Sequence, residues 1–193
     1  MDIILKRSIE WLDRLIAFDT TSRLSNLDLI SDIEKYMNEL GVPTRLTHDK
    51  DKTKANLWCT IGPQDIGGVV LSGHTDVVPI DGQEWTKTPF KMSEESGKLF
   101  GRGTSDMKGF CAIALAMAPE MKSRDLKVPI HFAFSFDEEV GCVGVRHLIK
   151  DVVDNLPLPR AVIVGEPTSM KIVGGNKGGR SFRTTVRLSL IHI

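Results

Sequence analysis

Cysteine is scarce in this chain, and its three cysteines lie too far apart to form any C-x-x-C pair. Cys59, Cys111 and Cys142 are also an odd number. This pattern argues against a disulfide framework and against a structural zinc ribbon. Reduced thiols in a cytosolic setting fit it better.

Net charge is absent as well, because 25 Lys+Arg residues balance 25 Asp+Glu residues. The basic residues form no cluster, which argues against nucleic acid and against an anionic membrane surface as partners. No apolar run approaches the ~18–20 residues that a membrane span needs. We expect no signal peptide, because charged residues interrupt the apolar start, namely Lys6, Arg7, Glu10, Asp13 and Arg14. The chain is therefore expected to be cytoplasmic, with neither a nucleic-acid nor a membrane partner.

The composition is sufficient for a packed globular core. The chain has 193 residues, 41% of them hydrophobic, and a chain of this length buries about 70% of its unfolded surface. Apolar residues at helical spacing predict an amphipathic helix through Ile9 and Leu12, and a second helix from about Ser25 to Gly41. Strands are expected over residues 43–47 and 56–61.

Three short apolar segments then alternate with two helical patterns. The segments are GGVVLSG (67–73), PIHFAFSF (129–136) and AVIVG (161–165), and the helices are expected after Ser105 and over residues 145–156. Two segments lack strict alternation, which favours strands covered on both faces. We expect Pro119 to end or kink the first helix, and a hairpin between residues 81 and 101. This order predicts an α/β fold with a largely parallel sheet.

One histidine and several acidic residues stand directly beside these elements. In chain order they are His74 and Asp76 after the first segment, Asp106 before the first helix, Asp137, Glu138 and Glu139 after the second segment, and Glu166 after the third. Sites in open α/β sheets form at the carboxyl ends of the strands. Carboxylates confined there raise one another's pKa, and a divalent cation resolves that conflict. Histidine together with carboxylates favours zinc or cobalt over magnesium.

Each of these residues also has a purely structural explanation. Asp76 and Glu166 fit turns, Asp106 fits a helix N-cap, and the two adjacent glutamates fit a solvated loop. We prefer the metal site because all of these positions fall at one expected sheet edge. Cys142, close to the acidic loop, is expected to be a small buried residue.

A nucleotide-binding module is the alternative from a different class. GRGTSD (101–106) resembles a dinucleotide fingerprint, but Asp106 occupies its last position and no proper strand is expected before it. GGNKGGRS (174–181) nearly matches a phosphate-binding loop, but Arg180 replaces the lysine and a strand-like segment follows where a helix is required.

The segments SGHTDVVP, GRGTSDMKG, DEEVGCVG and GEPT, in this order and spacing, resemble the di-zinc metallopeptidase and aminoacylase family of amidohydrolases. The resemblance extends from the first helix to about Val186. Within the family, DGQEWTKTPF, DEEVGCVGVRHLI and VGEPTSMKIVGGNKGG are most similar to the acetylornithine deacetylases. It implies a three-layer, zinc-peptidase-like α/β catalytic domain that hydrolyses the amide bond of an N-acyl amino acid. N-acetylornithine is the first candidate substrate, and a succinyl-diaminopimelate desuccinylase or related peptidase is the alternative.

The resemblance also implies a metal-ligand set of four residues for two zinc ions, with cobalt as a possible substitute. His74 would bind one zinc ion and Glu139 the other, while Asp106 would bridge both. Glu166 would complete the ligation of the zinc ion held by His74.

Two further residues receive catalytic roles from the same resemblance. Glu138 would be the general acid and base, and Asp76 would orient the His74 imidazole. The family pattern also implies a cis peptide bond between Asp106 and Met107.

Relatives continue into a lid domain, which carries dimer contacts and a histidine for the oxyanion, and then return with a final histidine ligand. We therefore expect residues 1–187 to be the N-terminal part of the catalytic domain, and residues 188–193 to be off the family pattern. The lid would be absent, and a homodimer is expected only for the full-length protein. The substrate would be a small-molecule N-acyl amino acid of arginine biosynthesis. This chain alone is expected to be inactive, and a catalytically silent metal-binding fragment remains a third possibility.

Overall fold

The computed structural model describes residues 3–175, 177–179, 182–189 and 191. Its helices are α1 (Ile3–Ile16), α2 (Leu27–Glu39), α3 (Lys108–Lys122) and α4 (Val145–Asn155). Its strands are β1 (Thr44–His48), β2 (Ala55–Ile61), β3 (Val69–His74), β4 (Ser93–Glu95), β5 (Lys98–Phe100), β6 (Ile130–Ser135) and β7 (Ala161–Val164). Each helix and strand expected between residues 3 and 165 is present, with ends shifted by a few residues, whereas the described residues 182–189 of the strand-like segment form no strand.

Five strands form the central sheet in the order β1-β2-β6-β3-β7. β3 pairs in parallel with both β6 and β7, whereas β2 is antiparallel to both of its neighbours. Thus β2 alone runs against the direction of the other four strands. The prediction of an α/β fold with a largely parallel sheet is confirmed.

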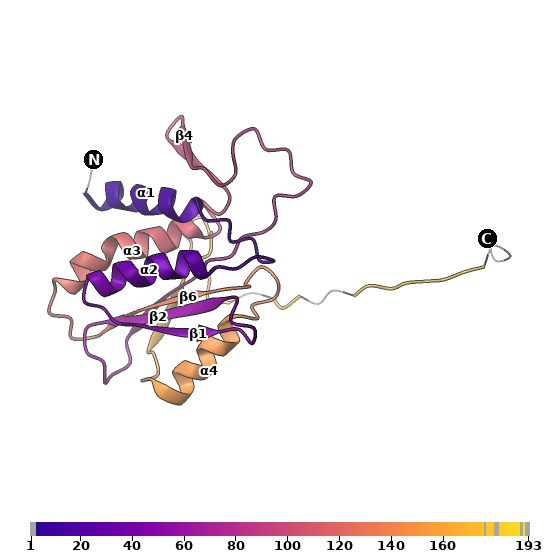
Figure 1. Ribbon diagram of the computed structural model, residues 1–193. Coiled ribbons are helices and arrows are strands. Elements are labelled where there is room, and N and C mark those ends of the chain that lie inside the picture. Colours follow the sequence, from indigo (N-terminus) through magenta and orange to yellow (C-terminus); the bar gives the residue numbers. More distant parts are fainter. Residues whose placement is uncertain (1–2, 176, 180–181, 190, 192–193) are drawn as a thin grey trace.

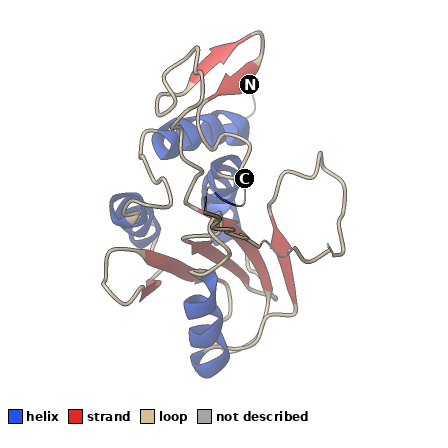
Figure 2. Ribbon diagram, turned by 90° about the vertical axis from the view of Figure 1, so that its right-hand side faces the viewer, coloured by secondary structure: helices blue, strands red, loops and turns tan. Residues whose placement is uncertain are grey.

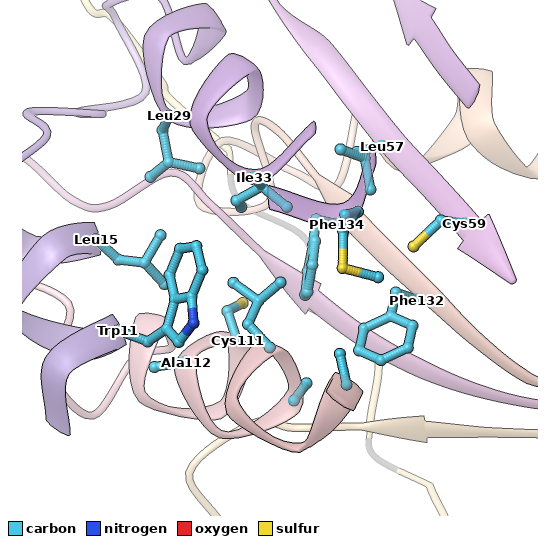
Figure 3. Packing of buried hydrophobic residues seen from close by; sticks show 14 of the residues in the cluster. Trp11, Leu15, Leu29, Ile33, Leu57, Cys59, Cys111, Ala112, Phe132 and Phe134 are labelled. Atoms are coloured by element: carbon cyan, nitrogen blue, oxygen red, sulfur yellow. The ribbon is translucent and has the colours of Figure 1, made fainter. Parts of the chain in front are cut away.

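Helices cover the two faces of the sheet unequally, which gives three layers. α1, α2 and α3 lie on one side, and α4 lies alone on the other (Figure 1; Figure 2 shows the same layers after a quarter turn). The larger core fills the three-helix side, where Trp11, Leu15 and Ile33 meet Phe132 and Phe134 from β6 (Figure 3). The helical spacing that predicted α1 therefore marks the stripe that it buries.

Replacing Phe134 by alanine is expected to destabilise the fold by about 3–5 kcal/mol, because the side chain is completely buried and packs edge-on against Phe132. Urea unfolding measures the loss. Val153→Ala on α4 is the control, because Val153 is 60% exposed and should change stability by less than about 0.5 kcal/mol. A loss below about 1 kcal/mol for Phe134→Ala would contradict this packing.

Pro119 does not end α3, so the first of the two effects expected from the sequence, an end or a kink of the helix, is wrong. The helix continues to Lys122 and includes the proline. A proline there removes the hydrogen bond to the carbonyl four residues earlier, which belongs to Leu115. The Tyr36 hydroxyl from α2 donates to this carbonyl at 3.2 Å. The helix tolerates the proline because another element satisfies the acceptor.

β7 departs from the expectation of strands covered on both faces. Val162, Ile163 and Val164 are each slightly more than half exposed. β7 forms an edge of the sheet and pairs with β3. Further along the chain, the described residues 182–189 lie away from the globular part (Figure 1). The apolar composition predicted the strand correctly, but it does not predict how much of the strand other elements cover.

The excursion between β3 and α3 contains the expected hairpin, formed by β4 and β5. β5 directly precedes residues 101–106, so a short strand stands before the GRGTSD segment after all. That strand belongs to the two-stranded hairpin and not to a parallel βαβ unit, which the dinucleotide fingerprint requires. The other nucleotide-like segment, 174–181, lies partly outside the described residues. Among the described helices, none has the length and apolar character required to cross a membrane.

Candidate metal centre

The parallel strands β3, β6 and β7 bring the acidic residues to one edge of the sheet. His74 is the last residue of β3, Glu138 and Glu139 follow β6 closely, and Glu166 lies two residues beyond β7. Asp106 reaches the same edge from the turn before α3. Parallel strands end on the same side, so a topology that the sequence predicts also determines where these side chains meet.

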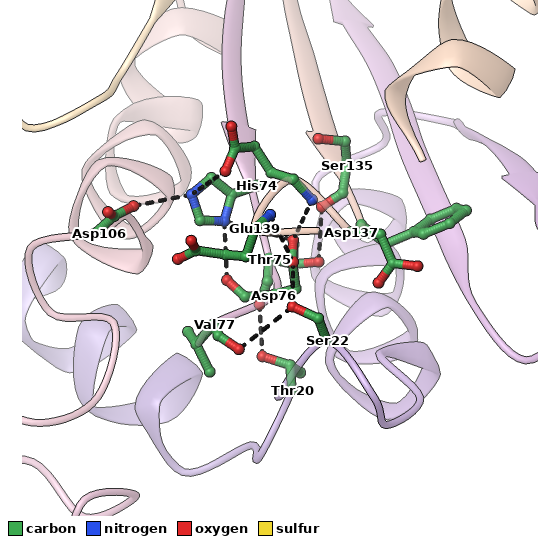
Figure 4. Close-up of polar contacts among 12 residues, drawn as sticks. Thr20, Ser22, His74, Thr75, Asp76, Val77, Asp106, Ser135, Asp137 and Glu139 are labelled. Carbon is green, nitrogen blue, oxygen red and sulfur yellow. Dashed lines mark hydrogen bonds and ion pairs between the residues drawn. The ribbon is translucent and has the colours of Figure 1, made fainter. Parts of the chain in front are cut away.

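The His74 imidazole lies at the centre of this cluster. Its Nε2 atom is 2.9 Å from Asp106 Oδ1, 3.8 Å from Glu166 Oε1 and 3.9 Å from Glu138 Oε2. Its Nδ1–H donates to the Asp76 backbone carbonyl at 2.9 Å. Figure 4 shows Asp106 and the Asp76 backbone on opposite sides of the ring. The hydrogen bond at Nδ1 therefore fixes the orientation of the ring, so that Nε2 faces the carboxylates.

Two groups of side chains have ligand atoms within 4.8 Å of one another in the described part of the chain. One comprises His74, Asp106 and Glu139, and the other comprises His74, Glu138 and Glu166. Every residue predicted as a ligand belongs to one of these groups. Glu138, predicted as a proton carrier, stands beside Glu166 in the second group. The roles of the individual residues stay predictions.

Electrostatics at the cluster reflect crowded negative charge. Burial disfavours a charged imidazole, but the hydrogen bond and charge of Asp76 raise the pKa of His74 to about 9. Burial raises the pKa of Glu139, and the neighbouring Asp106 carboxylate adds to that shift. Burial and the same neighbour also raise the pKa of Glu166. The surroundings therefore favour the protonated forms of His74, Glu139 and Glu166.

This donor set fits a divalent cation. A cation near Nε2 would replace the proton that balances the carboxylates, and it would also stabilise the charged forms of Glu139 and Glu166. One imidazole with several carboxylates is a donor set that zinc accepts. The hydrogen bond from Nδ1 to the Asp76 carbonyl orients the imidazole, as is usual for histidine ligands of zinc. The residues present therefore suit the metal that the motifs imply.

Asp76 contacts more groups than the resemblance implied. Its backbone carbonyl orients His74, while its carboxylate Oδ1 is 3.6 Å from the ring Nδ1. The carboxylate accepts the backbone N–H groups of Glu138 at 3.0 Å and Glu139 at 3.3 Å. It also accepts the Ser22 hydroxyl at 2.7 Å. Although burial opposes ionisation, the interactions with His74, Ser22 and Glu138 lower the pKa of Asp76.

Asp106 is not a helix N-cap, since Met107 occupies the N-cap position and no side-chain cap bond is present at α3. The Asp106–Met107 peptide bond is cis, which confirms the expectation from the family pattern. Asp106 is thus available to the cluster, where its side chain is 49% exposed.

Cys142 is exposed, so the expectation of a buried residue is wrong. Its thiol donates to Glu138 Oε1 at 3.2 Å, and this hydrogen bond is the main cause of the raised pKa of Cys142. Both residues line a cleft of ≈ 280 Å³, which His74, Glu166 and Met107 also line. The acidic loop is exposed to solvent at Cys142. The residue type alone does not predict this exposure, because cysteine is usually buried.

The fold and the site together define an α/β domain with a candidate metal centre at the carboxyl edge of its sheet. The protein-family model described as peptidase family M20/M25/M40 matches residues 70–185. The chain belongs to this family, and the family predicted from its motifs is confirmed.

Curated relatives include acetylornithine deacetylases from two bacteria. The chain is 36% identical over 184 residues to the enzyme of Buchnera aphidicola subsp. Schizaphis graminum, covering 92% of this chain and 47% of the relative. It is 37% identical over 155 residues to the enzyme of Shigella sonnei, covering 80% of this chain and 39% of the relative. The chain thus spans less than half the length of these relatives.

Solved structures share the fold at lower identity. An M20 family metallo-carboxypeptidase from Sulfolobus solfataricus superposes with a TM-score of 0.66 at 24% identity, over 86% of this chain and 37% of that protein. Human carnosine dipeptidase 1 gives a TM-score of 0.63 at 23% identity, over 83% of this chain and 39% of that protein. Both likenesses cover most of the α/β domain described above.

Proposed function

We propose that this chain supplies the metal-binding part of the active site of a zinc-dependent hydrolase that cleaves the amide bond of an N-acyl amino acid. The single observation that carries the proposal is the meeting of His74 with Asp106, Glu138, Glu139 and Glu166 at one sheet edge. Family membership and the acetylornithine deacetylases among its relatives support it. Residues 1–187 would form the N-terminal part of a longer catalytic domain.

Four side chains would hold two zinc ions in the complete enzyme. His74 and Glu166 would ligate one ion, Glu139 would ligate the other, and Asp106 would bridge both. When bound, the ions would supply Lewis-acid chemistry, which polarises a carbonyl and makes a water molecule more acidic. Cobalt would fit the same donors.

Glu138 would carry the proton. Its carboxylate lies 3.9 Å from His74 Nε2 and is 37% exposed, so water and substrate can reach it. Glu138 would accept a proton from the attacking water and deliver it to the departing amine. The Glu138 backbone N–H donates to the Asp76 carboxylate. This hydrogen bond fixes the backbone from which the Glu138 side chain projects, while its carboxylate stays accessible.

N-acetylornithine is the substrate we propose first, with ornithine and acetate as products in arginine biosynthesis. The support is the acetylornithine deacetylases among the relatives, at 36–37% identity. Succinyl-diaminopimelate is the alternative within the same chemistry. The complete enzyme would act in the cytoplasm as a homodimer, with contacts supplied by parts of the relatives' length that this match does not cover.

The 193-residue chain itself is expected to bind zinc but to release no acetate from N-acetylornithine. His74, Asp106 and Glu166 suffice for one zinc ion with water in an open position. Loss of one oxyanion donor alone costs ~10²–10³ in turnover, and the chain matches less than half the length of its acetylornithine deacetylase relatives. Zinc content after dialysis and an acetate assay test both statements.

Two results would contradict the proposal. Failure of the folded chain to retain any zinc would remove the metal site. Clear turnover, or two tightly bound zinc ions per chain, would show that other residues build the active site. Activity that appears only when the chain is joined to the unmatched part of an acetylornithine deacetylase relative would support it.

A further inference from the structure

Beneath the acidic loop that carries Glu138 and Glu139, polar groups form a closed ring of hydrogen bonds. Lys54, just before β2, donates its Nζ to Asp137 Oδ1 at 2.6 Å and also to the Ser22 backbone carbonyl. The Ser22 hydroxyl donates to the Asp76 carboxylate. That carboxylate receives the N–H groups of the two glutamates that follow Asp137. The ring thus returns to the loop from which it started.

The Lys54–Asp137 ion pair is the protected part of this ring. Both side chains are only 14% exposed, whereas the pairs Lys6–Glu10 and Arg23–Asp81 have both side chains more than half exposed. Asp137 has a φ of +54°, a conformation that residues other than glycine rarely adopt. The Asp137 carbonyl also accepts the N–H of Val143 at 3.1 Å. Lys54 therefore fixes the residue at which the chain turns from β6 into the acidic loop.

Ser22 links two carboxylates, that of Asp76 directly and that of Asp137 through Lys54. It is 7% exposed, its hydroxyl contacts Asp76, and its carbonyl contacts the lysine that holds Asp137. Its own N–H donates to the Val77 carbonyl at 3.2 Å, which ties it to the segment after β3 (Figure 4 shows Ser22 against Asp76 and Val77). The loop after α1 thus connects the histidine segment with the acidic loop.

We propose that Lys54 and Ser22 are positioning residues for the metal centre: by holding Asp137 and Asp76, they set the backbone from which Glu138 and Glu139 project. Neither residue has a ligand atom in the two groups around His74. This inference rests on the proposed function, because it concerns how the same site is assembled. It adds two residues that no motif marks.

Electrostatics and positioning predict opposite results when Lys54 is changed. Removing a positive charge next to a cation site strengthens cation binding by Coulomb's law alone. Losing the support of the acidic loop weakens it, and supporting residues behind metal ligands typically contribute ~10–100-fold to metal affinity. The direction of the change in zinc affinity therefore separates the two explanations.

The test compares Lys54→Met with the unchanged 193-residue chain by zinc competition against a chromophoric chelator. We expect zinc affinity to fall by ~10–100-fold. In the metal-free chain, hydrogen exchange at the Glu138 and Glu139 amides should become about tenfold faster, as for loss of one supporting hydrogen bond. Lys54→Arg keeps the charge and the donors, and should recover most of the affinity.

Arg7→Met is the matched control. Arg7 Nη1 also donates to one carboxylate, that of Glu120 at 2.8 Å, and to one backbone carbonyl, that of Ala116 at 2.8 Å. These contacts join α1 to α3. The control should lower overall stability without changing zinc affinity of the folded chain or exchange at the two glutamate amides.

Should Lys54→Met fail to fold, Ser22→Ala makes the same test without changing charge, and its zinc affinity should also fall. Zinc affinity equal to or tighter than that of the unchanged chain, or unaltered exchange at both glutamate amides, would overturn the inference. An unchanged chain that binds no zinc would instead refute the proposed function. The exchange measurement would still decide whether Lys54 and Ser22 hold the loop.

Discussion

Glu138→Gln, introduced into the complete enzyme, should keep its zinc and lose about 10²–10⁴-fold in turnover. Glutamine preserves the size of the side chain and an oxygen acceptor, but it cannot carry a proton at neutral pH. General acid–base catalysis contributes this much when the proton carrier is well placed. The measurement is kcat for acetate release, together with zinc content of the same sample.

The structure gives this experiment a second use, because Glu138 stands in a ligand group with His74 and Glu166. Loss of zinc in Glu138→Gln would make Glu138 a ligand, while normal turnover would exclude it from the reaction. Glu94→Gln is the control, since Glu94 is an exposed residue of β4 and its replacement should change neither quantity.

His74→Ala should weaken zinc binding more than replacement of any single carboxylate, by on the order of 10²–10³-fold. His74 belongs to both ligand groups, and complete structural zinc sites with four ligands contribute ~10–16 kcal/mol of binding free energy. One ligand therefore accounts for several kcal/mol. Competition with a chelator measures the loss in the 193-residue chain.

His48→Ala is the matched control, because His48 is an exposed histidine at the end of β1. It should bind zinc like the unchanged chain. Equal zinc affinity in His74→Ala and the unchanged chain would move the metal site away from this edge. Circular dichroism should show that both variants keep their helices.

Much of the site was predictable because most of its residues stand at, or just after, the ends of predicted strands. An apolar segment followed at once by His74, or by Glu138 and Glu139, places these residues at a strand end, and parallel pairing brings the ends together. The exposure of β7 was not predictable, because an apolar strand has the same composition whether or not another element covers it. Pro119 inside α3 needed a partner from α2, which local sequence does not show.

Ser22 and Lys54 escaped prediction for a different reason. Serine and lysine are mostly surface residues, and neither stands in a metal-binding pattern. Their contacts with Asp76 and Asp137 span 54 and 83 positions of sequence. Only the folded chain shows that a loop after α1 and the residue before β2 meet beneath the acidic loop. The same limit applies to Cys142, whose exposure depends on the path of that loop.

The closed ring beneath the acidic loop also has a consequence for how the chain folds. Its members come from segments between Ser22 and Glu139, which the pairing of β2, β3 and β6 brings together. Contacts between residues so distant in sequence form slowly, because closing long loops costs conformational entropy first. A cation that binds only the finished fold adds about 4 kcal/mol of stability at 1,000 times its Kd. The availability of zinc would thus govern how much of the chain stays folded.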